Sequence, residues 1–156
     1  DDELQVYSSS GERQYKTEET YAASGIGIEK DMSKTGFGPD NPPEYYFLPT
    51  RIVPFNLEKD DRYELLVSRN MSVAANFIPA YRQFPQGEVH SLYWDGVGLS
   101  ILWKTRLIKG TIIDYGIADY DNDETKELYV CVNTHPGAVG LKSIKTLMLG
   151  YELNVE

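Results

Sequence analysis

Cysteine, histidine and long apolar runs are scarce in this sequence of 156 residues. Its one cysteine, Cys131, excludes a disulfide within the chain. The two histidines, His90 and His135, fit no zinc or catalytic-triad motif, and we expect them to be surface or hydrogen-bonded residues. No stretch approaches the roughly 18 consecutive apolar residues of a membrane span. These absences argue against a disulfide scaffold, a local zinc site and membrane insertion.

Positive charge is also in deficit. Lysine and arginine total 15 against 24 aspartate and glutamate residues, which gives a formal net charge of −9. Such a surface repels phosphate backbones and attracts divalent cations, so nucleic acid is not expected as a partner. The alternative is that the acidic excess only keeps the protein soluble.

Tyrosine, glycine and proline, in contrast, are plentiful. The 12 tyrosines against 3 methionines favour strands, and the 13 glycines and 8 prolines indicate many turns. Residues 72–81 could form one helical turn, but Pro79 weakens it. The expected strands are residues 4–8, 14–18, 51–55, 64–68, 89–94, 100–107, 111–118, 127–133 and 143–153. The sequence therefore predicts an all-β chain of four hairpins and a final strand.

Two segments of the chain match each other. Residues 56–67 read NLEKDDRYELLV and residues 119–130 read DYDNDETKELYV, an offset of 119 − 56 = 63 residues. Both have acidic or amide residues at loop positions 1, 3 and 5, followed by Glu-Leu-x-Val. A weaker match of residues 15–17 to 103–105 has an offset of 88. The difference, 88 − 63 = 25 residues, indicates an insertion within residues 26–49, which are rich in glycine and proline.

The self-match predicts four-stranded antiparallel meanders, the blades of a β-propeller. Residues 46–109 would form a complete blade, residues 1–30 and 110–156 partial blades, and residues 31–45 a loop insertion. Because a propeller has at least about four blades, we expect an incomplete propeller. The chain would be a fragment of a longer protein, or its copies would self-associate through exposed blade edges.

The second acidic loop carries a family resemblance. Asp119-x-Asp121-x-Asp123-x-x-x-Glu127, set between two apolar strands, resembles the calcium loop of FG-GAP/VCBS repeats, the integrin-like propeller family. Residues 94–104 resemble the outer strands of bacterial blades of this kind. The resemblance covers residues 46–153 well and residues 1–30 loosely, about two to three blades.

The resemblance implies a set of calcium ligands, and calcium prefers six to eight hard oxygens. The implied ligands are the side chains of Asp119, Asp121, Asp123 and Glu127 and the carbonyl of Thr125. A weaker second loop offers Asn56, Glu58, Asp60 and Glu64. The family has glycine at loop position 6, where φ is often positive, and this sequence has Glu124, at a cost on the order of 1 kcal/mol.

A metal-free hairpin is the alternative for both loops. In it the aspartate side chains would accept hydrogen bonds from backbone N–H groups as Asx-turns. For the second loop, residues 119–127, calcium and the metal-free hairpin both stay open. For the first loop, residues 56–64, the metal-free hairpin is favoured because the set of possible ligands is poorer.

The resemblance implies a non-catalytic scaffold that binds a protein or glycan outside the cytoplasm, where calcium is abundant. The alternative is a propeller domain of a carbohydrate-active enzyme, or a carbohydrate-binding module. An enzyme would need paired carboxylates, and Asp114 with Asp119 is the one tempting pair. Aromatic residues could form a sugar platform, although the period-2 spacing of the tryptophans favours core packing. The aromatic candidates are Trp94, Trp103, Tyr45, Tyr46 and Tyr81.

Overall fold

The computed structural model describes residues 2–30, 45–57, 60, 62–72, 82–134 and 145–153. Within these residues the chain is all-β, with antiparallel sheets of which none is closed. Residues 73–81 of the helical turn considered at 72–81, and most of the insertion at 31–45, lie outside the described residues. The expected all-β class is therefore confirmed.

The described residues form twelve strands. In chain order they are β1 Glu3–Tyr7, β2 Arg13–Thr20, β3 Gly27–Glu29, β4 Tyr45–Phe47, β5 Val53–Phe55, β6 Glu64–Met71, β7 Gln86–Trp94, β8 Leu99–Lys104, β9 Ile108–Lys109, β10 Thr111–Ala118, β11 Glu127–Asn133 and β12 Thr146–Glu152. Each expected strand overlaps one of them. The short ribbon of β3 and β4, at the ends of the insertion, and the two-residue strand β9 were not expected.

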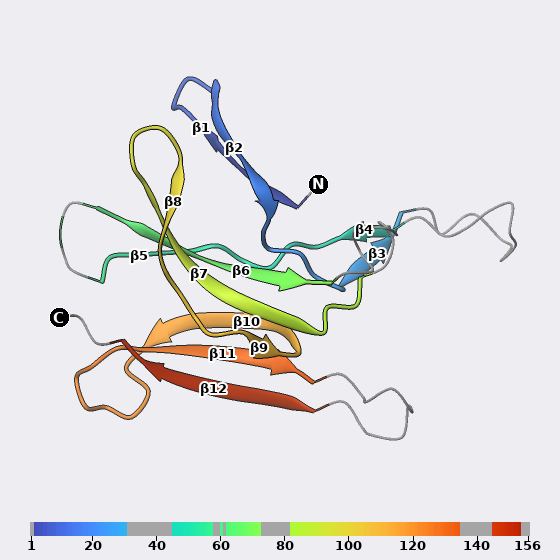
Figure 1. Ribbon diagram of the computed structural model, residues 1–156, viewed down its shortest axis with the longest axis vertical. Helices are drawn as coiled ribbons and strands as arrows, with labels where there is room; N and C mark the ends of the chain where they lie inside the picture. Colours follow the sequence, from blue (N-terminus) through green and yellow to red (C-terminus); the bar gives the residue numbers. More distant parts are fainter. Residues whose placement is uncertain are drawn as a thin grey trace, which may run out of the picture.

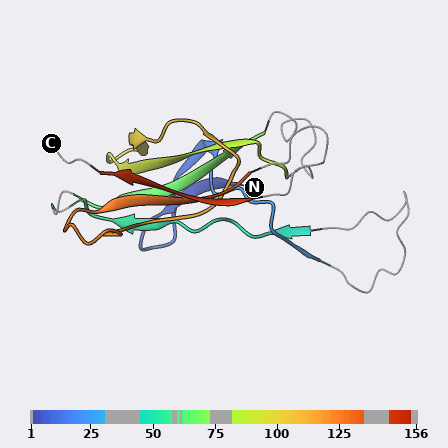
Figure 2. The same cartoon turned by 90° about the horizontal axis from the view of Figure 1, so that it is seen from below.

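The strands are arranged in three layers (Figure 1). The middle sheet is a meander in the order β5-β6-β7-β8, with β9 also paired to β7. The ribbon of β1 and β2 lies on one side of it, and the meander β10-β11-β12 lies on the other. Figure 2 shows the same sheets seen from a perpendicular direction.

The two matching segments take equivalent places in their meanders. Residues 56–63 connect β5 to β6, and residues 119–126 connect β10 to β11, so each is the first connection of its meander. Phe55 pairs with Glu64 and Ala118 pairs with Glu127, which are the same partners after an offset of 63 residues. The sequence repeat is therefore also a repeat of strand pairing.

The middle sheet is buried on both faces, because neighbouring residues of a strand point to opposite sides. Leu66 belongs to one apolar cluster and Val67 to another. The larger cluster, shared with β10 and β11, contains Leu66, Val89, Ile108, Ile112, Tyr115, Leu128, Val130 and Val132. The smaller one, shared with the β1–β2 layer, contains Leu4, Tyr21, Val67 and Leu92.

A β-bulge in β8 changes which face its side chains occupy. Leu92 pairs with Ile101 and Ser91 with Trp103, so Leu102 has no direct partner. The bulge sends Trp103 to the larger cluster, whereas Leu99 packs against the smaller one. Period-2 spacing predicted core packing for Trp103, which is confirmed, but the bulge places Trp103 on the opposite face of the sheet from Leu99.

Candidate metal centre

The loop between β10 and β11 contains two left-handed residues. Asn122 has φ of 62° and Glu124 has φ of 71°. Asparagine tolerates this conformation, whereas a glutamate there costs on the order of 1 kcal/mol. The positive φ expected at Glu124 is confirmed, and the tight turn brings alternate side chains to one side of the loop.

Four of the predicted ligands come together in this loop. One carboxylate oxygen from each of Asp119, Asp121, Asp123 and Glu127 lies within 4.8 Å of the others. The three aspartates are exposed, and Glu127 is half-buried at the start of β11. Thr125 lies in the same loop, and the role of its carbonyl stays a prediction.

Backbone N–H groups hold these carboxylates in place. Asp119 accepts from the N–H groups of Asp123 and Glu124, both at 3.2 Å. Asp123 accepts from Thr125 at 2.7 Å. Glu127 accepts from Tyr120 at 2.6 Å, and Asp121 accepts from Asp123 at 3.3 Å. A carboxylate has about four acceptor sites, so this capping leaves room for a cation.

The electrostatics of the cluster fit a divalent cation. Within the described residues, none of the four carboxylates forms an ion pair. Four negative charges within 4.8 Å repel one another, and a cation among them would convert that repulsion into attraction. The donors are all hard oxygens, which are the ligands that calcium and magnesium take. The four carboxylates could therefore hold a metal ion. The backbone N–H bonds to Asp119 and Asp123 are also the contacts expected of the metal-free hairpin, so they do not distinguish the two alternatives for this loop.

The first acidic loop is held by its own hydrogen bonds. Glu64 accepts from the Leu57 N–H at 3.3 Å, which is the counterpart of the Glu127 bond to Tyr120 after the 63-residue offset. The Asn56 side chain donates to the Asp60 carbonyl, and Asp60 accepts from Arg62 at 2.8 Å. Glu58 lies outside the described residues. These contacts agree with the metal-free hairpin favoured for this loop.

Asp114 and Asp119, the candidate pair of catalytic carboxylates, each make contacts with other groups. Asp114 forms an ion pair with Arg51, at 2.8 Å between the Arg51 Nε and the Asp114 Oδ1. Asp119 belongs to the acidic cluster. Each carboxylate is therefore already in contact with a group other than its supposed partner.

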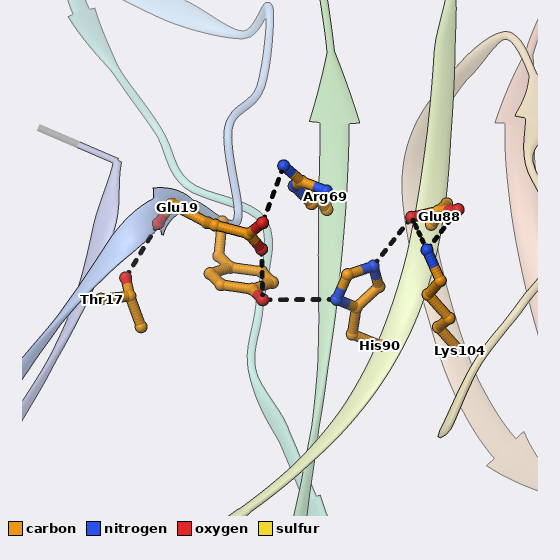
Figure 3. Close-up of polar contacts among 7 residues, drawn as sticks. Thr17, Glu19, Arg69, Glu88, His90 and Lys104 are labelled. Carbon is orange, nitrogen blue, oxygen red and sulfur yellow. Dashed lines mark hydrogen bonds and ion pairs between the residues drawn. The ribbon is translucent and has the colours of Figure 1, made fainter. Parts of the chain in front are cut away.

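A chain of charged and polar side chains surrounds His90 between the β1–β2 layer and the middle sheet (Figure 3). The His90 Nε2 lies 3.0 Å from Glu88, and its Nδ1 lies 3.3 Å from the Tyr21 hydroxyl. Lys104 donates to Glu88 at 3.1 Å. The Tyr21 hydroxyl donates to Glu19 at 3.1 Å, and Arg69 pairs with the same Glu19 at 3.1 Å.

Burial and hydrogen bonds shift the pKa values of the groups along this chain. His90 is 1% exposed, and burial lowers its pKa although the Glu88 carboxylate opposes the shift. Burial alone would raise the pKa of Glu88, but hydrogen bonds from His90 and Lys104 lower it below its ordinary value. Burial also raises the pKa of Tyr21. His90 is thus a hydrogen-bonded interior residue, and His135 lies outside the described residues.

Sequence reasoning singled out His90 and missed its partners. Glu88 and His90 are two residues apart on β7, so a strand places them on the same face, which was a readable signal. Glu19 and Tyr21 come from a distant segment of the chain, since Tyr21 and His90 are 69 residues apart in the sequence. No local pattern encodes a contact over that separation.

The aromatic candidates divide into core and surface residues. Trp103 packs against the larger cluster, as expected. Trp94 is 38% exposed and makes an edge contact with Tyr15, so the prediction of core packing was wrong for Trp94. Tyr45 and Tyr46 are 49% and 68% exposed, so the core interpretation was wrong for these two. They line a cavity of about 630 Å³ together with residues of β1 and with Arg82. Tyr81 lies outside the described residues.

Comparison of the chain with protein-family models, with curated proteins and with solved structures finds no significant match in any of the three. Within the described ranges, no helix is long and apolar enough to cross a membrane.

Proposed function

We propose that this chain is a non-catalytic repeat module, stabilised by calcium, whose sheets are blades of an incomplete β-propeller. The observation that carries the proposal is the convergence of four carboxylates in the loop between β10 and β11. The ion would be held by Asp119, Asp121, Asp123 and Glu127. It would offset their repulsion and hold the two ends of the loop together.

The strand arrangement supports the blade interpretation. Four strands of the five-stranded middle sheet, β5-β6-β7-β8, form an antiparallel meander, which is the form of a propeller blade, and β9 adds a fifth strand beside β7. The sheet β10-β11-β12 repeats its first three strands, and the two sheets pack face to face through one apolar cluster. In Figure 1, β5 and β10 both end on the same side of the layers, so their acidic loops leave the sheets at the same end.

The exposure of the proposed calcium site bears on the compartment in which the module would work. The three aspartates are exposed. Calcium-binding extracellular modules typically bind with a Kd of about 0.1–1 mM. Such a site would be filled outside the cytoplasm, where a calcium-stabilised scaffold would present its surface to a protein or glycan.

Calorimetric titration of calcium into chelator-treated protein tests the proposal. We expect one site, and a melting temperature that rises by about 5–10 °C when calcium is at 100 times the Kd, which corresponds to about 2.7 kcal/mol. Asp121→Asn keeps a side-chain oxygen for the Asx-turn but removes one charge, so it should abolish most of both signals. Magnesium should bind more weakly, because it dehydrates reluctantly and demands octahedral geometry.

Asp60→Asn is the control, since it makes the same aspartate-to-asparagine change in the first loop, at the position that corresponds to Asp123. We expect it to leave the heat of calcium binding and the calcium-induced melting shift unchanged. If the unmodified protein gives neither heat nor a melting shift with calcium, the acidic loop is a metal-free hairpin and the proposal fails.

A further inference from the structure

The cavity that Tyr45 and Tyr46 line combines aromatic rings with charged side chains. Its volume of about 630 Å³ lies within the roughly 300–1,000 Å³ of typical small-molecule sites. Such sites are lined mostly by apolar and aromatic side chains, with a few polar groups that orient the ligand. Here the lining includes the aromatic residues Tyr45, Tyr46 and Phe47 and the charged residues Asp2, Glu3 and Arg82.

The aromatic residues of β4 are held in place by the protein itself. Tyr45 and Phe47 are two residues apart on a strand and therefore share a face, where their ring centroids lie 6.1 Å apart. Phe47 lies against Gly27 on the paired strand β3, where a Cβ would come within 3.2 Å of the Phe47 ring. The Arg82 guanidinium covers the Phe47 ring, 4.5 Å from its centroid. Rings fixed in this way lose little conformational entropy when a ligand binds.

Tyr46 is the most exposed of the three rings. It is 68% exposed, compared with 49% for Tyr45, and Ile52, which also lines the cavity, is 46% exposed. Exposed apolar surface rimmed by polar residues marks a site of interaction. A tyrosine ring has an apolar body and a polar tip, so it can pack against the C–H groups of a ligand while its hydroxyl stays hydrated.

The charged residues place hydrogen-bond donors beside acceptors. Arg82 forms an ion pair with the Asp2 carboxylate, and Glu3 forms one with Lys16 at 3.2 Å. A guanidinium has five N–H donors, and within the described residues only Asp2 accepts from the Arg82 side chain. That bond uses the Oδ2 of Asp2, so the Oδ1 can still accept. The pair can therefore offer a ligand a donor and an acceptor at neighbouring positions.

The charges of the cavity argue against several classes of ligand. Two carboxylates against one guanidinium leave an excess of one negative charge in the lining, which disfavours phosphate and sulfate groups. A wholly apolar ligand would remove water from Asp2 and Arg82 without replacing its hydrogen bonds. An organic cation would meet the Arg82 guanidinium at the Phe47 ring. A neutral molecule with C–H faces and many hydroxyl groups meets none of these obstacles.

We propose that this cavity binds a neutral saccharide. The C–H face of one sugar ring packs on Tyr46, with Tyr45 beside it. Of two neighbouring sugar hydroxyls, one donates to the Asp2 carboxylate and the other accepts from Arg82. This assignment rests on the proposed function, since it names a glycan as the ligand of the surface that the module presents.

The cavity and the candidate metal centre are independent of each other. In Figures 1 and 2, the ribbon of β3 and β4 lies at the opposite end of the layers from the loop that connects β10 to β11. None of the four carboxylates of that loop lines the cavity. We therefore expect sugar binding in a folded protein to be the same with excess calcium and with a chelator.

A glycan array probed with the full chain tests the class of ligand. It carries neutral glucan, mannan, galactan, xylan and chitin oligosaccharides, together with sulfated heparin fragments. We expect binding to at least one neutral series, and stronger binding to it than to any heparin fragment. Absence of binding to every neutral series would overturn the proposal, and so would binding to heparin that is as strong or stronger.

Replacing Tyr46 tests the packing of the sugar ring. Calorimetric titration uses the neutral oligosaccharide with the strongest signal on the array. Tyr46→Ala should raise its Kd at least about tenfold, as the loss of an aromatic anchor does in other interfaces. Tyr46→Phe keeps the ring and should bind nearly as tightly as the unmodified protein.

Tyr63→Ala is the matched control. Tyr63 is 67% exposed, almost the same as Tyr46, but it does not line the cavity. We expect it to leave the Kd unchanged, and we expect both alanine variants to keep the melting temperature of the unmodified protein because both side chains are largely exposed. Equal affinities for Tyr46→Ala and Tyr63→Ala would contradict the proposal.

Arg82→Lys tests the hydrogen bonds to the sugar. It keeps a positive charge beside Asp2 but loses the planar fork that donates to two acceptors at once, so we expect the Kd to rise about fivefold or more. An unchanged Kd would contradict the hydrogen bonds proposed for Asp2 and Arg82.

Titrating calcium and the oligosaccharide separately distinguishes this proposal from the calcium site. Calcium binding without sugar binding would overturn the saccharide site alone. Sugar binding without calcium binding would overturn the metal site and leave the cavity as a glycan site.

Discussion

The middle sheet packs against a mainly apolar surface on one face and against a surface that includes charged side chains on the other. Toward β10 and β11, eight buried residues form one cluster. Toward the β1–β2 layer, the buried cluster has four members, and the charged chain around His90 lies in the same interface. The two interfaces therefore depend on solution conditions to different extents.

Besides the ion pair of Arg51 with Asp114, neutral side chains bond to the backbone in the apolar interface. Asn70 contacts both backbone groups of Ile112 and the carbonyl of Ala23. The Tyr115 hydroxyl accepts from the Ser68 N–H at 3.1 Å and donates to the Arg51 carbonyl. None of these groups changes charge near neutral pH. This interface should therefore keep its contribution to the free energy of unfolding at a pH at which the charged chain around His90 loses part of its contribution.

Asn70→Ala should give the largest loss of stability. The change leaves the N–H and C=O of Ile112 and the C=O of Ala23 without their side-chain partner in a buried position. Leaving buried backbone groups unpaired costs about 1–3 kcal/mol each, so we expect a loss of about 3 kcal/mol in the free energy of unfolding. Urea denaturation followed by circular dichroism measures it.

Ser91→Ala is the matched control for that variant. Ser91 is also fully buried, but its hydroxyl has no hydrogen-bond partner among the described residues. Removing an unpaired hydroxyl should change the free energy of unfolding by less than about 1 kcal/mol, in either direction. A loss as large as that of Asn70→Ala would mean that burial alone, and not backbone bonding, determines the cost.

Local patterns in the sequence were sufficient for the longer strands and for the acidic loop. The strands predicted at residues 111–118 and 127–133 are observed with the same bounds as β10 and β11. The four carboxylates of the candidate metal centre lie within residues 119–127, so a single turn brings them together. Contacts of short sequence separation can be predicted from spacing because few backbone conformations satisfy them.

Contacts between distant segments could not be predicted in this way. The bulge at Leu102 reversed the face of Trp103, because one extra residue changes the parity of a strand. Asn70 reaches Ile112 over 42 residues, and only the packing of two sheets determines that contact. The charged chain around His90 depends on the position of the β1–β2 layer for the same reason.

Two tyrosines offer a matched comparison of the two interfaces. Tyr115→Phe removes a hydroxyl that bonds buried backbone groups, and we expect it to cost about 2 kcal/mol. Tyr21→Phe removes a hydroxyl that bonds Glu19 and His90, and we expect a cost of about 1 kcal/mol at pH 8. Thermal and urea unfolding of both variants measure the difference. Equal costs would show that the two interfaces do not differ in this respect.

The smallest expected difference between the two interfaces is in how their contributions to stability depend on pH. Burial keeps the pKa of His90 below its ordinary value of 6.5, so the unfolded chain binds a proton that the folded chain rejects. This stability is fully present above pH 6.5 and is lost as the pH falls toward the lowered pKa, by at most about 1.4 kcal/mol per pH unit.

Unfolding measured from pH 8 to pH 5 should show this decline in the unmodified protein and a smaller one in His90→Gln. The charged and titratable groups that face His90 are Glu88, Lys104, Arg69, Glu19 and Tyr21. Glu88 has its pKa lowered from 4.5, so its own contribution is lost only at more acidic pH. Tyr115→Phe should follow the pH profile of the unmodified protein, because the hydroxyl that it removes bonds only neutral groups. If His90→Gln also follows that profile, the charged chain contributes nothing that titrates, and the two faces of the sheet differ only in how much apolar surface they bury.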